Sequence, residues 1–171
     1  MPTSEPEDDW IDLRRRQWAK EMPDLDTVGM AILGRARVVT MHVRPKIEKI
    51  FARHGLDSGE CDVLFTLLRA GRPYRLRPTE LFNSLMITSG GLTGRLSRLE
   101  KAGLIERIPD ANDGRSVPVG LTPAGLKKAR AAFADDMRLE AELLASLSEA
   151  DKRTLAGLLR KLSIGLMKRG R

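Results

Sequence analysis

The sequence predicts a mainly α-helical fold with a small β-hairpin. Apolar residues recur at helical spacing along most of the chain, capping residues and glycines divide this pattern into separate helices, and one short segment alternates with the period of a strand. The chain has 171 residues, of which 42% are hydrophobic and 31% charged, so it can bury a core without disulfides or metal ions. We therefore expect one globular domain with appended helices.

The N-terminal part contains an acidic segment followed by two helices. Residues 1–12 are expected to be a disordered acidic tail, because they offer almost nothing to bury. A short helix is expected around Trp18, and a long one over residues 26–53. Pro45 falls inside the long helix, and a proline removes a backbone donor and clashes with the preceding turn. We therefore predict a break or kink at that point.

The middle of the chain carries clear signals for three more helices. Asp57 and Glu60 form a capping box that opens the first of them. Apolar side chains surround most of this helix, so we expect it to be central to the fold. Pro78 stands where the first residue of a short second helix should be. Thr88 is predicted to cap the third, over residues 89–102.

The remaining segments complete a recognisable order of elements. Residues 117–121 alternate in the manner of a strand, and the Asn-Asp-Gly cluster at 112–114 is typical of a hairpin turn. Long helices are expected over 123–147 and 148–168. Helix, short helix, turn, helix and hairpin follow one another as in a winged helix-turn-helix, in which residues 89–102 would be the recognition helix.

The charge balance favours a polyanionic partner. Thirty Lys and Arg against 23 Asp and Glu give a formal net charge of +7, which is typical of proteins that bind nucleic acid or anionic membranes. No apolar run is long enough to span a membrane, and the N-terminus is unlike a signal peptide, so we expect a cytoplasmic protein. No nucleophile elbow, phosphate-binding glycine loop or histidine-based site indicates an enzyme. Neither a metal nor another cofactor is expected.

The predicted recognition helix has two chemically different faces. Leu92, Leu96 and Leu99 share one, while small, hydroxyl and basic side chains lie opposite and suit a major groove; a solvated basic surface is the alternative. An arginine at the hairpin tip could enter a minor groove, or could pair within its own turn. The candidate DNA-binding residues are Thr88, Ser89, Gly90, Thr93, Ser97, Arg98 and Lys101 of the helix, Arg75, Arg77 and Thr79 as phosphate anchors, and Arg115 of the wing.

Three sequence runs are specific enough to indicate a family. They are GLDSGECDVLFTLLRAG, RPTELFNSLMITSGGLTGRLSRLEKAGLIERIPDANDGRS and VGLTPAG, and together they resemble the MarR family of bacterial transcription regulators. Arg77 departs from the small hydroxyl residue that is more common there. The resemblance implies a homodimer, interlocked through its terminal helices, on a pseudo-palindromic double-stranded DNA site. The leucine-rich terminal helices fit such an interface, although packing within the monomer would use the same residues.

The run QWAKEMPDLD resembles the extra N-terminal helix of the urate-responsive branch of this family. Matching that branch by motif gives Trp18, Asp62, Arg95 and Arg107 as effector-binding residues. The implied effector is urate or a related aromatic or carboxylate anion, stacked on the tryptophan and held by an arginine fork. Arg95 flanks the leucine face of its helix and should reach back into the protein. Plain alternatives are a packing tryptophan, an aspartate paired on its own helix, and a phosphate contact for Arg107.

Two other functional hypotheses stay open. Cys61, the single cysteine, could sense oxidants as in other MarR-family members, although burial would raise its pKa. The chain could also be a protein-interaction module that does not bind DNA. Our interpretation is a ligand-responsive regulator, acting as a repressor, with four parts: an acidic tail (1–12), N-terminal helices for dimerisation and effector binding (13–56), a DNA-binding domain (57–123) and C-terminal dimerisation helices (124–171).

Overall fold

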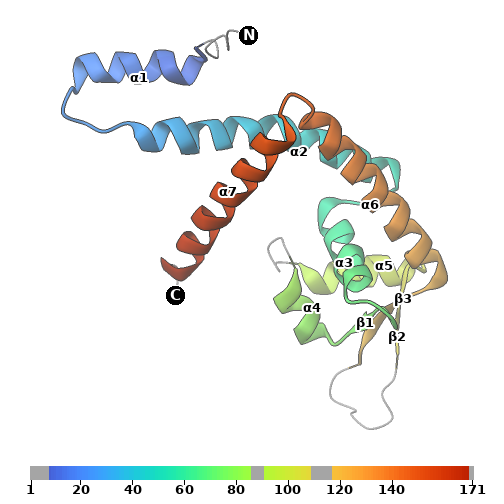
Figure 1. Cartoon of the computed structure of the whole chain (residues 1–171). Coiled ribbons are helices and arrows are strands. Elements are labelled where there is room, and N and C mark those ends of the chain that lie inside the picture. Colours follow the sequence, from blue (N-terminus) through green and yellow to red (C-terminus); the bar gives the residue numbers. More distant parts are fainter. Residues whose placement is uncertain (1–7, 86–90, 109–116, 170–171) are drawn as a thin grey trace. The chain divides into compact units, whose positions relative to one another are not determined.

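The computed structural model describes residues 8–85, 91–108 and 117–169. It confirms the predicted fold class, because helices dominate and three short strands form the single sheet within these ranges (Figure 1). The chain divides into two compact units, residues 1–46 and 47–171. The elements are α1 (Trp10–Glu21), the π-helical turn η1 (Met30–Gly34), α2 (Arg35–Arg53), α3 (Ser58–Arg69), β1 (Arg75–Leu76), α4 (Pro78–Ser84), α5 (Leu92–Lys101), β2 (Ile105–Arg107), β3 (Val119–Leu121), α6 (Pro123–Leu143) and α7 (Glu149–Arg169).

The first unit begins with α1, which starts earlier than the sequence predicts. The Asp9 carboxylate accepts hydrogen bonds from two backbone N–H groups of the first turn, and the Asp12 carboxylate accepts one from the Asp9 N–H. This reciprocal cap fixes the start of the helix at Trp10. The prediction of a disordered tail over residues 1–12 is therefore wrong for its last residues. The helix expected around Trp18 is present and spans 12 residues.

An arginine joins α1 to the following helical segment. Arg35 Nε donates to the Asp9 carboxylate at 2.8 Å, and its Nη2 donates to Asp12 at 2.6 Å. Nearby, Ile11 packs against Gly34, where an added Cβ would lie 2.9 Å from Ile11 Cδ1. The charged fork and the apolar contact together hold α1 against the π-helical turn.

The long N-terminal helix is not broken by its proline. Residues 28–53 are helical throughout, with the π-helical turn inside them, and Pro45 lies within α2. The predicted break is therefore wrong. A proline at this position leaves the carbonyl of Met41 without its helical donor. Met41 is 63% exposed, so water can hydrate this carbonyl and the helix continues.

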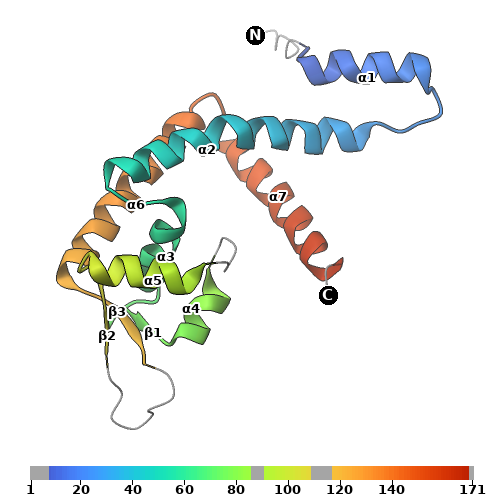
Figure 2. The ribbon, with the colours of Figure 1, turned by 180° about the vertical axis from the view of Figure 1, so that it is seen from behind.

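Helix α3 lies at the centre of the second unit, as its apolar circumference predicts. It contacts α4, α5, α6 and β3, and the views from both sides show it among them (Figure 1, Figure 2). The predicted capping box is present, since Asp57 and Glu60 each accept a hydrogen bond from the backbone N–H of the other. The large side chains buried most completely in the core of this unit include Val63, Leu64, Leu67, Leu81, Leu99 and Val119.

Three strands form an antiparallel sheet in the order β1–β3–β2. The predicted hairpin strands β2 and β3 pair with Glu106 opposite Gly120; residues 109–116, which contain the predicted turn, lie outside the described residues. The sequence did not predict strand β1, in which Arg75 pairs with Gly120 on the other edge of β3. A strand of two residues has no alternation to reveal it, and its partner is distant in sequence.

The start of α6 connects the sheet to the end of α5. The Thr122 hydroxyl accepts a hydrogen bond from the Gly125 N–H at 3.0 Å and donates to the Gly103 carbonyl at 2.7 Å. The Thr122 N–H donates to the Leu104 carbonyl at 3.2 Å. Gly125 lies so close to this carbonyl that a Cβ there would be 1.8 Å from the Leu104 oxygen. The run LTPAG therefore holds β3, α5 and α6 together at one point.

The two C-terminal helices are present, with one boundary corrected. Helix α6 ends at Leu143 rather than near residue 147. The next helix, α7, has its predicted cap, where Ser148 and Asp151 exchange hydrogen bonds between side chain and backbone. Across residues 8–85, 91–108 and 117–169, no helix combines the length and apolarity needed to cross a bilayer.

Candidate nucleic-acid interface

Helix α5 begins later than the sequence predicts. Gly91 precedes its first residue, Leu92, with a φ of +79°, a left-handed conformation that glycine adopts without strain. A residue in this conformation cannot continue a right-handed helix, so the predicted range 89–102 is corrected to Leu92–Lys101. The candidate DNA-binding residues that lie outside the described part of the chain are Thr88, Ser89, Gly90 and Arg115.

The two faces of α5 differ in burial. Leu92, Leu96 and Leu99 are 9%, 5% and 1% exposed and belong to the core of the second unit. The exposed residues of the opposite face are Thr93, Gly94, Ser97, Arg98 and Lys101. This face offers hydroxyl groups, a backbone uncovered at Gly94 and cations, which are groups that hydrogen-bond base edges and phosphates.

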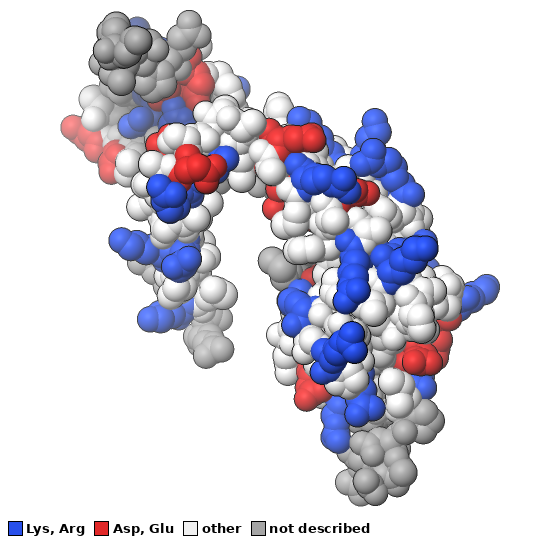
Figure 3. All heavy atoms as spheres, turned by 45° about the vertical axis from the view of Figure 1, so that its right-hand side comes forward, with Lys and Arg blue, Asp and Glu red and all other residues white. Residues whose placement is uncertain are grey.

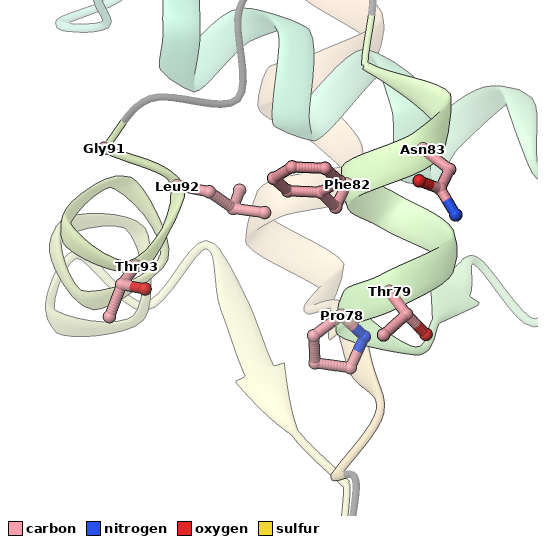
Figure 4. Close-up of a pocket in the computed structure, with 7 residues that line it drawn as sticks. All are labelled: Pro78, Thr79, Phe82, Asn83, Gly91, Leu92 and Thr93. Carbon is pink, nitrogen blue, oxygen red and sulfur yellow. The ribbon is translucent and has the colours of Figure 1, made fainter.

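A groove of about 440 Å³ lies between α4 and α5 (Figure 4). Phe82 of α4 and Leu92 of α5 point toward each other across it, while Thr79 and Asn83 lie on the side of α4 turned away from Leu92. Phe82 is 51% exposed. Phe82 and Asn83 were not among the predicted DNA-binding residues. A usable signal was the apolar Leu81 in the run PTELFNS, because a short helix that turns this leucine to the core presents its other side to solvent.

The start of α4 carries the residues predicted to anchor phosphates. Arg77 occupies the capping position, and its backbone N–H donates to the Glu80 carboxylate at 2.8 Å. The helix start is thus capped by Glu80, although Arg77 replaces the small hydroxyl residue. Arg75, Arg77 and Thr79 are all exposed, so cations and a hydroxyl surround the first turn of α4, where they can contact phosphate oxygens.

Arg98 has a second role besides the predicted DNA contact. Its Nε donates to Glu60 at 2.7 Å and its Nη2 to Asp57 at 2.9 Å. The hydrogen bond that it donates to Glu60 raises the pKa of the guanidinium above its ordinary value. Asp57 and Glu60 are the capping box of α3, so these ion pairs fix α5 to the start of the central helix. Arg98 is therefore a positioning residue for the recognition helix.

The four predicted effector-binding residues fall in both units. Asp62, on α3, is buried with 7% exposed. The Arg95 side chain packs over Gly59 of the same helix, where an added Cβ would lie 2.2 Å from Arg95 Nε, so Arg95 turns toward the protein. Gly59 and Asp62 are three residues apart and share one side of α3. Arg107, on β2, pairs with a carboxylate of α5, and Trp18, on α1 of the first unit, is 45% exposed.

Basic side chains gather on one face of the second unit. In the lower right of Figure 3, Lys and Arg side chains outnumber the acidic ones on the visible surface, down to the undescribed segment. The whole chain carries a formal net charge of +7. Such a surface attracts polyanions over a distance set by the ionic strength.

The part that contains these features matches a known family. A model of the MarR family matches residues 54–116. The chain is 37% identical over 144 residues to the HTH-type transcriptional regulator PecS of Dickeya dadantii (strain 3937), with 84% of this chain and 87% of PecS covered. The chain belongs to the MarR family. It is also 30% identical over 121 residues to the HTH-type transcriptional repressor Mb2911 of Mycobacterium bovis, with 70% and 84% covered.

Solved MarR-family structures share this fold. A mutant of E. coli MarR complexed with operator DNA gives a TM-score of 0.63 at 27% identity and covers 80% of this chain and 99% of that chain. AbsC, a MarR-family regulator from Streptomyces coelicolor, gives 0.73 at 22% identity over 86% and 98%, a likeness of fold alone. PecS and Mb2911 are named as transcriptional regulators, which confirms the prediction that this MarR-family chain is a DNA-binding regulator and not an enzyme.

The single cysteine of this MarR-family chain is poorly placed for oxidant sensing. Cys61 is 0% exposed, and burial, followed by the carboxylates of Asp136, Asp57 and Glu60, raises the pKa of its thiol to about 12. At neutral pH the thiolate fraction is then about a thousandfold below that of an ordinary cysteine.

We expect Cys61 of the native protein to resist iodoacetamide while the urea-unfolded chain is alkylated completely, as measured by mass spectrometry. Rapid alkylation of the native protein would restore the oxidant-sensing hypothesis.

Proposed function

We propose that this MarR-family chain is a cytoplasmic repressor that binds a pseudo-palindromic DNA site as a homodimer and is released by a small anion such as urate. The observation that carries the proposal is the exposed face of α5, set on a buried leucine face within a winged helix. The named relatives support regulation and repression, and the MarR–operator complex supports duplex DNA as the partner.

In this proposal the residues divide into base-reading and phosphate-binding groups. Thr93, Ser97 and Lys101 would reach base edges in the major groove, where hydroxyl and ammonium groups discriminate between bases. Gly94 has no side chain and would allow the helix backbone to approach the DNA closely. The nearest atom to an added Cβ is 3.9 Å away, so packing within the protein does not require glycine at this position. The remaining contacts, to phosphates and the minor groove, would come from Thr88, Ser89, Gly90, Arg75, Arg77, Thr79, Arg98 and Arg115.

Exposed apolar side chains support the homodimer. In α7, Leu155, Leu158 and Leu166 are 42%, 58% and 58% exposed, and the first unit also exposes large apolar residues such as Ile32 and Leu33. An apolar surface of this extent normally marks a protein interface. A two-fold dimer would present two copies of α5 to half-sites about one helical turn of DNA apart.

The proposed effector site rests on the placement of Arg95 and Asp62. Arg95 lies against α3 on the side that carries the buried Asp62, so an anion that bound Arg95 would change how α5 packs on α3. Such an anion would bind the two orientations of α5 with different affinity, which is what a switch requires. Trp18 and Arg107 complete the set through stacking and a second positive charge.

Salt dependence and a wing substitution test DNA binding. We expect operator affinity, measured by fluorescence anisotropy, to fall about a thousandfold between 50 and 200 mM salt, because phosphate contacts release counterions.

Arg115→Ala should weaken binding by about 1–3 kcal/mol and leave the melting temperature unchanged. Arg16→Ala, which removes an arginine of α1 that pairs with Asp8, is the control for net charge. A chain with no salt-dependent affinity for duplex DNA would be an interaction module instead.

A second experiment tests the effector site. Trp18→Ala and Arg95→Ala should each abolish the release of operator DNA by urate, because one removes the stacking surface and the other the anion contact. Release is followed by electrophoretic mobility shift across a urate titration, with Arg160→Ala of α7 as the control. If both variants still respond like the wild type, the proposed effector residues are wrong, while the DNA-binding proposal is unaffected.

A further inference from the structure

The first unit contains a groove that the proposed function does not use. It lies between α1 and the helical segment that begins with η1, has a volume of about 520 Å³, and is lined among others by Trp10, Arg14, Met30, Arg37, Val38 and Met41. All its lining residues belong to residues 1–46, so the groove is a property of this unit alone. Its volume is in the range of about 300–1,000 Å³ that is common for small-molecule sites.

The lining combines apolar surface with positive charge. Met30, Val38 and Met41 form the apolar wall, and the two arginines provide cations. Among the described residues, no carboxylate lines the groove, and Arg14 and Arg37 have no ion-pair partner. Cations gathered beside apolar surface without compensating acids favour an amphipathic anion.

Trp10 and Arg14 are already arranged for such a ligand. The Arg14 guanidinium lies 4.2 Å from the centroid of the Trp10 ring. A stacked guanidinium keeps its N–H groups in its own plane, where they can donate two parallel hydrogen bonds to a carboxylate. Trp10 is 45% exposed, so part of its surface can also contact an aromatic ligand.

Two features hold the groove in shape. Arg35 connects α1 to the helical segment through Asp9 and Asp12, which fixes the two walls relative to each other. Part of the lining is the π-helical turn, through Met30 and Gly34. Turns of this kind are rare and occur frequently at functional sites. A preformed site loses less entropy on binding than one that must be ordered.

We propose that this groove binds an amphipathic aromatic carboxylate, with the carboxylate on Arg14 and Arg37 and the ring against the apolar wall. Of the residues proposed to bind urate, Arg95 and Arg107 belong to the second unit and Trp18 lies on α1, and none of the three lines this groove. The groove would give the regulator a ligand contact made by residues of the first unit alone.

The test compares a carboxylate with its neutral amide on the full-length protein. Naphthalene-2-carboxylate should bind by isothermal titration calorimetry, and naphthalene-2-carboxamide at least about tenfold more weakly, because it lacks the charge-assisted hydrogen bonds. Arg14→Gln and Arg37→Gln should each weaken carboxylate binding about tenfold. Arg16→Gln, on the same helix but paired with Asp8, should change the affinity less than about twofold.

The two tryptophans of the chain locate the ligand. Trp18→Phe leaves Trp10 as the only tryptophan, and its fluorescence should be quenched with the same Kd that calorimetry gives. Val38→Phe fills the groove and should abolish binding, whereas Arg95→Ala should retain it. Equal affinity for acid and amide, unchanged Trp10 fluorescence, or loss of binding in Arg95→Ala would each overturn the proposal. Absence of binding together with a more dissociated Val38→Phe protein would assign the groove to a second copy of the chain and overturn it as well.

Discussion

Gly125→Ala is expected to destabilise the second unit by about 3 kcal/mol, because the new methyl group meets backbone that cannot move aside cheaply. The Cβ would lie 1.8 Å from the Leu104 oxygen and 2.8 Å from its carbonyl carbon. Relief requires separating α6 from the end of α5, which breaks the hydrogen bonds that Thr122 makes to Gly103 and Leu104. Urea unfolding followed by circular dichroism measures the loss.

Gly165→Ala is the matched control for this substitution. Gly165 is also helical, in α7, but nothing lies within 4 Å of an added Cβ. Alanine there should stabilise the protein by up to about 1 kcal/mol through its higher helix propensity. Equal behaviour of the two variants would mean that Gly125 and Leu104 are not in close contact.

The double substitution Leu158→Glu with Leu166→Glu should convert the proposed dimer to a monomer and lower operator affinity at least about a hundredfold. Both leucines are 58% exposed in the single chain, so carboxylates cost little in the monomer but cannot be desolvated at an apolar interface. A monomer holds one half-site and loses the gain from binding both together. Sedimentation velocity and anisotropy titrations measure the two effects.

Arg160→Glu provides a control that matches this change in charge. Two leucines replaced by glutamate lower the net charge of the chain by two, and one arginine replaced by glutamate does the same. Arg160 is exposed on the side of α7 opposite the leucines. It should leave the dimer intact and weaken DNA binding only through net charge. Dissociation by Arg160→Glu, or a stable dimer with both glutamates, would contradict the proposed interface.

Local signals in the sequence predicted most of the second unit. The capping box of Asp57 and Glu60, Pro78 at the first position of α4, and the cap of α6 at Thr122 each depend on neighbouring residues alone. The leucine face of α5 follows from helical periodicity, and its burial agrees with that pattern. Where a common capping signal or a clear apolar period decides the structure, the sequence is sufficient.

The elements that were missed depend on distant residues or on uncommon local chemistry. Strand β1 exists because Arg75 and Leu76 meet β3, and nothing next to them in sequence announces it. Gly91 has a left-handed backbone, and the Gly90-Gly91 pair was a usable turn signal that the predicted helix start at Ser89 ignored. The start of α1 was overlooked because Asp12 closes a capping box in which glutamate is the usual residue.

Much the same distinction applies to the candidate site. Which residues of α5 face outward could be predicted from helical geometry alone. The attachment of Arg98 to Glu60 and Asp57 could not, because it joins two helices that are far apart in sequence. The groove of the first unit was also beyond prediction, since the π-helical turn that lines it leaves no signature in composition or spacing.

The attachments of α5 have a consequence for how the regulator would leave its operator. Once an anion occupies Arg95, the ion pairs of Arg98 and Glu100 and the hydrogen bond at the Gly103 carbonyl still hold α5, all toward the C-terminal part of the helix. The first turn, with Thr93 and Gly94, then moves farthest. An inducer would therefore first reduce the preference of the regulator for its operator over other DNA sequences, and only then its affinity for DNA in general. The ligand-bound regulator would redistribute to random chromosomal sites instead of leaving DNA altogether.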